Sequence, residues 1–144
     1  MIQMKPLSLT ILLATMIAPH LNAQPAITLT GLDALTWETT PEGVGFAALD
    51  GARFEEAYMA MVRLPAGTIS PPHVKSANMF GVMVQGTMTH VAEGDNTAAD
   101  APIGPGGYYK VPAGLAHVSS CVSATPCVTF LYQDGAFDFV PTGQ

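Results

Sequence analysis

Three histidines, His73, His90 and His117, are the residues of this chain best suited to chemistry. A neutral imidazole nitrogen is the commonest metal ligand in proteins, and the same ring exchanges protons near neutral pH. His73 lies in a segment bounded by glycines, residues 67–86, and His117 lies in a glycine- and proline-rich segment, residues 106–121. These two segments are the candidates for a metal or ligand site.

Lys75 and Met79 follow His73, and both are poor partners for a divalent cation. A protonated ammonium repels the ion and cannot ligate it until burial lowers its pKa from about 10.4. A thioether is a weak, soft donor, useful to copper(I) but not to zinc or iron(II). Lys75 is either a surface lysine or an inward one that holds a carboxylate or phenolate of a ligand. In the second case Met79 and Met83 would line the pocket, although core filling also explains these methionines.

Short apolar runs separated by glycine and proline turns position these residues. No stretch reads as a convincing amphipathic helix, so the pattern predicts an all-β sandwich or barrel. Strands are expected over residues 58–64, 79–84, 88–91, 108–111, 117–122, 128–132 and 137–140.

The expected place of His90 depends on a turn at Gln85-Gly86. A two-residue hairpin there would pair residues 79–84 with residues 88–91. His90 would then face Gly81 and point to the same side as Met79. His73, His90 and His117 could in that case form a three-nitrogen site. The alternative is that His90 is a hydrogen-bonded histidine of the interior or rim.

The two segments resemble the two motifs of the cupin superfamily, G-x5-H-x-H-x3-E-x6-G and G-x5-P-x-G-x2-H-x3-N. The second is matched at Gly106, Pro112, Gly114 and His117, and the first at both glycines and at His73. A closer resemblance is to exported members of the ChrR-like cupin group. It is carried by residues 37–51, 63–67, 71–73 and 106–108 and by Cys121 and Cys127.

The resemblance implies a cupin β-barrel of jelly-roll architecture. In metal-binding cupins, one divalent ion (Zn, Fe, Mn or Cu) is held by the two histidines and glutamate of the first motif and the histidine of the second. Here His73 and His117 are present, whereas Lys75 and Met79 replace the other two ligands. The losses favour a non-catalytic small-molecule-binding or sensing module with a degenerate metal site. The alternative is a metal-dependent oxygenase, isomerase or lyase that uses His73, His117 and a third ligand.

Cys121 and Cys127 are the only two cysteines, and a turn-like spacer separates them. A hairpin can bring their Cα atoms within the range of about 4.4–6.8 Å that a disulfide needs. In an exported protein such a pair oxidises, so we expect a disulfide. Two cysteines alone are too few ligands for a soft metal site.

Residues 1–23 have the features of a secretory signal peptide. Lys5 precedes an apolar run, residues 7–18, and Ala23 is a small residue at the expected cleavage position. A membrane anchor is the alternative, but a spanning helix needs about 20 apolar residues. Pro19 and His20 interrupt the run before that length. We therefore expect a periplasmic or secreted protein in which residues 24–144 form one cupin domain.

Charge and composition narrow the class of partner. The formal net charge is −6, and removal of Lys5 makes it −7. The few Lys and Arg residues do not cluster, which argues against binding to nucleic acid or to anionic lipid. With 49% apolar and 11% charged residues, a packed core is expected. A small-molecule ligand is the expected partner, and no membrane contact is expected after cleavage. A homodimer is left open.

The intact mass of the exported product should correspond to a chain that begins at Gln24, because Ala23 ends the signal-like segment. A product that still carries residues 1–23 would contradict it.

Overall fold

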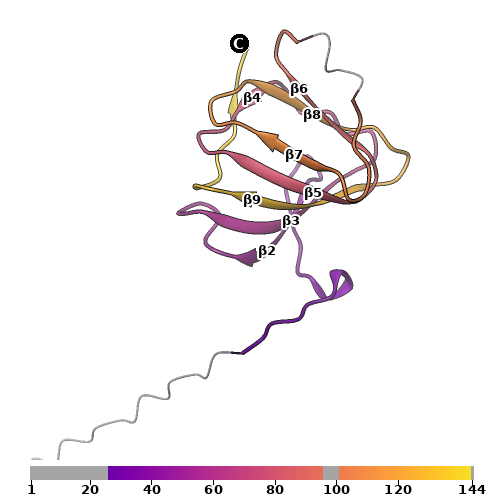
Figure 1. The fold of residues 1–144 in the computed structure, drawn as a ribbon, viewed down its shortest axis with the longest axis vertical. Helices are drawn as coiled ribbons and strands as arrows, with labels where there is room; N and C mark the ends of the chain where they lie inside the picture. Colours follow the sequence, from indigo (N-terminus) through magenta and orange to yellow (C-terminus); the bar gives the residue numbers. More distant parts are fainter. Residues whose placement is uncertain (1–25, 96–100, 144) are drawn as a thin grey trace, which may run out of the picture.

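Two antiparallel sheets form the barrel in a computed structural model that describes residues 26–95 and 101–143 (Figure 1). The larger sheet has the strand order β1-β2-β3-β9-β5-β7, and the smaller has the order β10-β4-β8-β6. The strands are β1 Glu38–Thr39, β2 Gly45–Asp50, β3 Tyr58–Leu64, β4 His73–Val74, β5 Met79–Gln85, β6 Met88–Ala92, β7 Tyr108–Val111, β8 His117–Cys121, β9 Cys127–Gln133 and β10 Val140–Pro141. The all-β prediction is confirmed. The expected signal peptide, residues 1–23, lies outside the described residues.

Alternating side chains divide the large sheet into an inner and an outer face. On β3, residues 58, 60, 62 and 64 belong to the cluster that fills the barrel, whereas Met61 belongs to a second cluster. Leu35 and Trp37 pack on this second, outer cluster, which also contains Ala47 and Val128. The period of two that predicted the strands therefore separates the barrel interior from an outer face that the N-terminal segment partly covers.

The predicted hairpin at Gln85-Gly86 is wrong. β5 pairs with β7 and β9 in the large sheet, whereas β6 pairs with β8 in the small one. The chain crosses between the sheets at Gly86, whose φ of 75° lies in the left-handed region. The alternation within β5 is nevertheless as expected, because Met79, Gly81 and Met83 are buried along one face.

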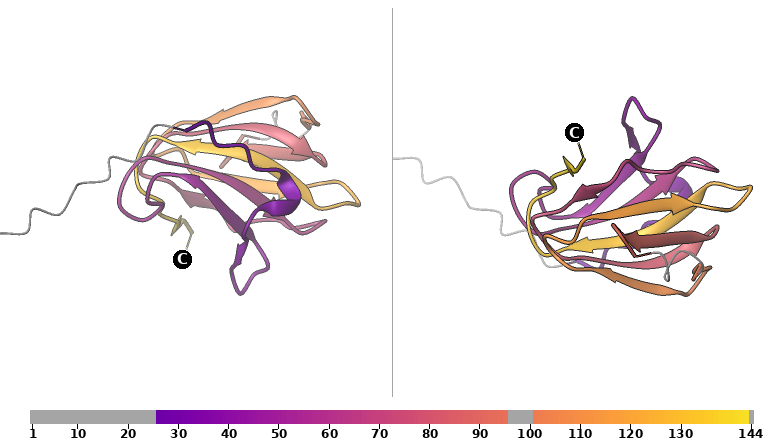
Figure 2. Two further views of the ribbon diagram at one scale, coloured as in Figure 1. Left: turned by 90° about the horizontal axis from the view of Figure 1, so that it is seen from below. Right: turned by 90° about the horizontal axis from the view of Figure 1, so that it is seen from above.

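The strand expected over residues 137–140 is mostly irregular. Only Val140–Pro141 forms a strand, β10, and it pairs with the two residues of β4. Residues 136–142, called the strap below, run around one end of the barrel (Figure 2, right, yellow). Two backbone hydrogen bonds fasten it, from Phe137 N to Arg53 O and from Thr142 N to Pro72 O.

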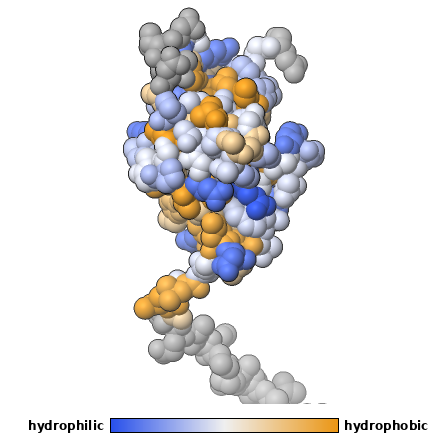
Figure 3. All heavy atoms as spheres, turned by 90° about the vertical axis from the view of Figure 1, so that its right-hand side faces the viewer, coloured by the Kyte–Doolittle hydropathy of each residue, from blue (hydrophilic) through white to orange (hydrophobic). Residues whose placement is uncertain are grey.

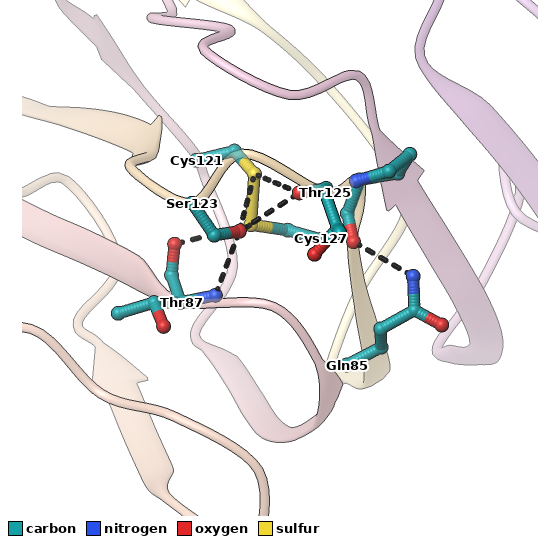
Figure 4. Close-up of a disulfide and its surroundings, with 7 residues drawn as sticks. Gln85, Thr87, Cys121, Ser123, Thr125 and Cys127 are labelled. Atoms are coloured by element: carbon teal, nitrogen blue, oxygen red, sulfur yellow. Dashed lines mark hydrogen bonds between the residues drawn. A yellow bond between two sulfur atoms is a disulfide. The ribbon is translucent and has the colours of Figure 1, made fainter.

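The disulfide between Cys121 and Cys127 is confirmed, with a Cα–Cα distance of 5.7 Å (Figure 4). The connection that it closes is not a hairpin. Cys121 ends β8 in the small sheet and Cys127 begins β9 in the large sheet. The bond therefore ties the two sheets together at the end of the barrel opposite the strap.

Gly86, the last glycine of the first motif, packs against this disulfide. A Cβ on Gly86 would lie 2.8 Å from Ser123 Oγ and 2.9 Å from the Cα of Cys127. The Ser123 hydroxyl accepts a hydrogen bond from Thr87 N at 3.1 Å and donates one to Thr125 O at 2.8 Å (Figure 4). The glycine is needed here both for its positive φ and for this close approach.

The first described residues lead away from the barrel. Ile27 and Leu29 are each 90% exposed. Figure 3 shows the corresponding apolar segment standing clear of the domain. Within the described part of the chain, no helix has the length and apolar character needed to cross a membrane.

Replacing both cysteines by alanine should lower the free energy of unfolding by about 2 kcal/mol, because the unfolded chain gains entropy when the short loop opens. Urea denaturation of the Cys121→Ala/Cys127→Ala variant tests this, with reduced wild type as the matched control. An unchanged midpoint would show that the bond contributes no stability.

Candidate functional site

His73 and His117 face each other inside the strap end of the barrel. His73 begins β4, His117 begins β8, and the two are direct cross-strand partners. Their side chains are 3% and 1% exposed, and their ring centroids lie 4.3 Å apart. The fold therefore brings together the two histidines that the motifs single out.

Both rings are held in the same way. Nδ1 of His73 lies 2.9 Å from Pro71 O, and Nδ1 of His117 lies 3.0 Å from Leu115 O. Because a carbonyl oxygen can only accept a hydrogen bond, each Nδ1 carries the proton. The lone pair of each neutral ring is therefore on Nε2, as in most metal-ligating histidines. Nε2 of His117 is buried and has no hydrogen-bond partner.

His90 also points into the barrel, although not through the hairpin expected from the sequence. It lies opposite Ser119 on β8, and its Nδ1 is 2.9 Å from Ser119 Oγ. Its ring packs on Tyr109 with centroids 4.2 Å apart. A Cβ on Gly81 would lie 2.1 Å from Tyr109 Cζ, so the missing side chain makes room for this aromatic ring. Like that of His117, Nε2 of His90 is buried without a partner.

Met79 lies at the same end as the histidine pair, at the beginning of β5. Its cross-strand neighbours are Val111 on β7 and Gln133 on β9. Met79 and Met83 both belong to the apolar cluster inside the barrel. Both methionines thus face inward, as expected for pocket lining and for core filling alike.

Lys75 is not a surface lysine, because it is only 5% exposed. Its Nζ donates to the backbone carbonyl of Asp138 at 2.5 Å and lies 3.8 Å from the ring centroid of Phe137. The Asp138 carboxylate accepts from Ser76 N at 3.0 Å. The ammonium that stands in place of a metal ligand therefore fastens the strap.

The strap also supplies residues that the sequence did not indicate as part of the site. Phe139 stacks on His73, with ring centroids 4.0 Å apart and an interplanar angle of 17°. Gln133, just before the strap, is fully buried and donates to Ala136 O at 2.7 Å. The alternation of Phe137 and Phe139 is the available signal in the sequence, and it predicts a strand.

The arrangement of donors differs from the four-ligand set. Within residues 26–95 and 101–143, no group of three or more His, Cys, Asp or Glu side chains is placed to hold a metal ion. The ring centroid of His90 is 6.3 Å from that of His117, compared with 4.3 Å for the His73–His117 pair. The two paired imidazoles, with one orphaned Nε2, suit an ion that accepts few protein ligands.

Burial keeps the histidines neutral. It lowers the pKa of His73 and that of His90 to about 4, and it also lowers the pKa of His117. The Lys75 ammonium further lowers the pKa of His73 and His117. Burial likewise lowers the pKa of Lys75 to about 8, against the opposing effect of Asp138. At neutral pH the imidazoles are therefore in the form that can bind a metal ion.

A cavity of about 220 Å³ lies beside the loop that carries Arg53. The guanidinium lies between the rings of Phe46 and Phe54, at 4.3 and 4.4 Å from their centroids. None of the three histidines, Lys75 or the two methionines lines this cavity. It is therefore separate from the histidine site.

Comparison with known families identifies the domain. Residues 26–137 match the model of the ChrR cupin-like domain, which is most of the chain. The chain belongs to the ChrR cupin-like family. No curated protein sequence matches it. The predicted resemblance to the ChrR-like cupin group is confirmed.

Solved structures agree on the cupin fold. The polyketide cyclase RemF from Streptomyces resistomycificus is 16% identical, with a TM-score of 0.64, over 83% of this chain and 87% of its own. The cupin domain of Schizosaccharomyces pombe Cnp3 is 17% identical, with a TM-score of 0.59, over 73% and 67%. The Rhodobacter sphaeroides complex of SigE with the anti-sigma ChrR contains a chain 20% identical, with a TM-score of 0.58, over 72% and 51%.

The stability of the metal-free protein should fall as the pH falls from about 6.5 to about 4. Unfolded histidines take up protons at a pKa of about 6.5, whereas His73 and His90 in the fold resist protonation until about 4. The stabilising contribution of these two histidines is fully present above their pKa in the unfolded chain. It is lost as the pH falls through their pKa in the folded protein. Urea midpoints of wild type and His90→Gln across this range test it. The variant should lose less stability, and parallel curves would contradict the expectation.

Proposed function

We propose that this protein is an exported, non-catalytic binding module that captures a small, partly apolar ligand at the His73–His117 pair through one bound metal ion. The observation that carries the proposal is the orphaned Nε2 of His117, buried beside a second imidazole anchored in the same way. A buried acceptor without a partner is unfavourable, so a metal ion or a ligand donor on this nitrogen is stabilising. A metal ion held there would supply a Lewis-acidic centre with open coordination positions.

The replaced motif positions support binding rather than catalysis. The glutamate position is Met79, and the second histidine position is Lys75, whose ammonium is engaged by the strap. Neither side chain supplies the carboxylate or imidazole that the family pattern has at these positions. Lys75, Met79 and Met83 are the proposed lining of the ligand site.

A metal-dependent enzyme, such as an oxygenase, isomerase or lyase, is the second candidate. The specific observation in its favour is the orphaned Nε2 of His90, which offers a third inward nitrogen. A shift of His90 toward His117 would complete three protein ligands and leave an open position, as catalytic metal sites commonly do.

Export to the periplasm or the exterior is part of the proposal. It rests on the signal-like residues 1–23 and on the disulfide, which persists in oxidising compartments.

Alanine substitution of His73 or His117 should nearly abolish metal uptake, because each removes one ligand of a poor site. The protein, purified without a polyhistidine tag, is offered zinc(II), iron(II), manganese(II), copper(II) and copper(I) in turn, and bound metal is measured. Lys110→Ala on the exposed side of β7 is the matched control.

Substitution of His90 distinguishes the two candidate functions, the binding module and the metal-dependent enzyme. Loss of metal in His90→Ala as well as in the other two variants favours the enzyme. Full binding in His90→Ala leaves a two-nitrogen site and favours the binding module. Stoichiometric metal in His73→Ala or His117→Ala would show that the site has been assigned to the wrong residues.

A further inference from the structure

The donors at the strap end of the barrel are soft or neutral. His73 and His117 present neutral imidazole nitrogens. Met79 begins β5, in the other sheet, at the same end of the barrel. Met79 is buried and inward, where the family motif has a glutamate. Imidazole and thioether donors suit copper(I), whereas hard divalent ions rely on carboxylate oxygen.

The positively charged Lys75 lies near the two histidines. The Lys75 ammonium is buried, donates to Asp138 O and stands over the Phe137 ring, both of which are contacts of a cation. Asp138 is the nearby carboxylate that opposes this charge, and it is engaged by Ser76 N. Repulsion grows with the charge of the entering ion, so a divalent cation suffers about twice the penalty of a monovalent one.

We propose that the His73–His117 site is selective for copper(I) over divalent metals, with the Met79 thioether as the additional donor. This inference rests on the proposed metal site and names the ion that the site takes. A two-nitrogen, one-sulfur set without carboxylate matches a soft monovalent ion that accepts few ligands.

The cysteines do not interfere with the measurement of copper(I) affinity. The chain has two, both in the disulfide, so no free thiol competes for copper(I). Ascorbate in oxygen-free buffer keeps copper reduced and leaves a buried disulfide intact, so thiol reductants are not needed. Copper(I) affinity is measured by competition with a chromogenic copper(I) chelator, and zinc(II) affinity by titration against a fluorescent zinc chelator.

Comparison of wild type with three variants tests the role of the Met79 sulfur and the preference between the two ions. Met79→Leu conserves volume and removes the sulfur; it should weaken copper(I) binding about tenfold or more and leave zinc(II) unchanged. Met61→Leu, in the outer cluster on β3, is the matched control and should change neither affinity. Lys75→His/Met79→Glu restores the family ligand types and should reverse the preference toward zinc(II). Circular dichroism and urea midpoints verify that each variant is folded.

The outcomes distinguish a failure of the copper(I) assignment from a failure of the metal site on which it rests. If wild type binds zinc(II) as tightly as copper(I), or if folded Met79→Leu keeps full copper(I) affinity, the copper(I) assignment is overturned while the histidine site stands. If wild type binds neither ion, the metal site itself fails, and the copper(I) assignment fails with it.

Discussion

The pairing of β4 with β8 is the constraint on which the site depends. β4 has only two residues, and a single cross-strand pair places His73 opposite His117. The other side of β4 is held by β10, the end of the strap. Lys75, which immediately follows β4, fastens the strap through a hydrogen bond to Asp138. The residue that stands in place of a family ligand therefore maintains the geometry of the two histidines that remain at the motif positions.

Burial then determines the protonation state of these two histidines. Carbonyl acceptors hold each Nδ1 proton, and the apolar surroundings disfavour a charged ring. Both effects leave Nε2 with a free lone pair inside the barrel. The same effects are unfavourable for stability when nothing is bound, because a buried nitrogen acceptor then has no hydrogen-bond partner.

Local patterns predicted the strands well and their pairing poorly. Strands β3 and β7 follow the expected residues, because alternation and turn glycines are local signals. The hairpin expected at Gly86 is wrong, because a left-handed glycine permits either a hairpin or a crossing between sheets. The inward face of β5 was still predicted correctly, since side-chain alternation does not depend on which strand is the partner. The closeness of His73 and His117 came from the family motif, and the stacking of Phe139 on His73 had no local signal that distinguished it from a strand.

The two ends of the barrel are closed by different physical means. At one end a disulfide joins the sheets, and Gly86 packs tightly against it. At the other end the strap is held by hydrogen bonds, by the contact of Lys75 with Phe137 and by ring stacking on His73. A covalent closure stays shut under native conditions, whereas non-covalent contacts open locally at a fraction of the global unfolding free energy. The histidines lie at the end that non-covalent contacts close, and the disulfide joins the sheets at the opposite end.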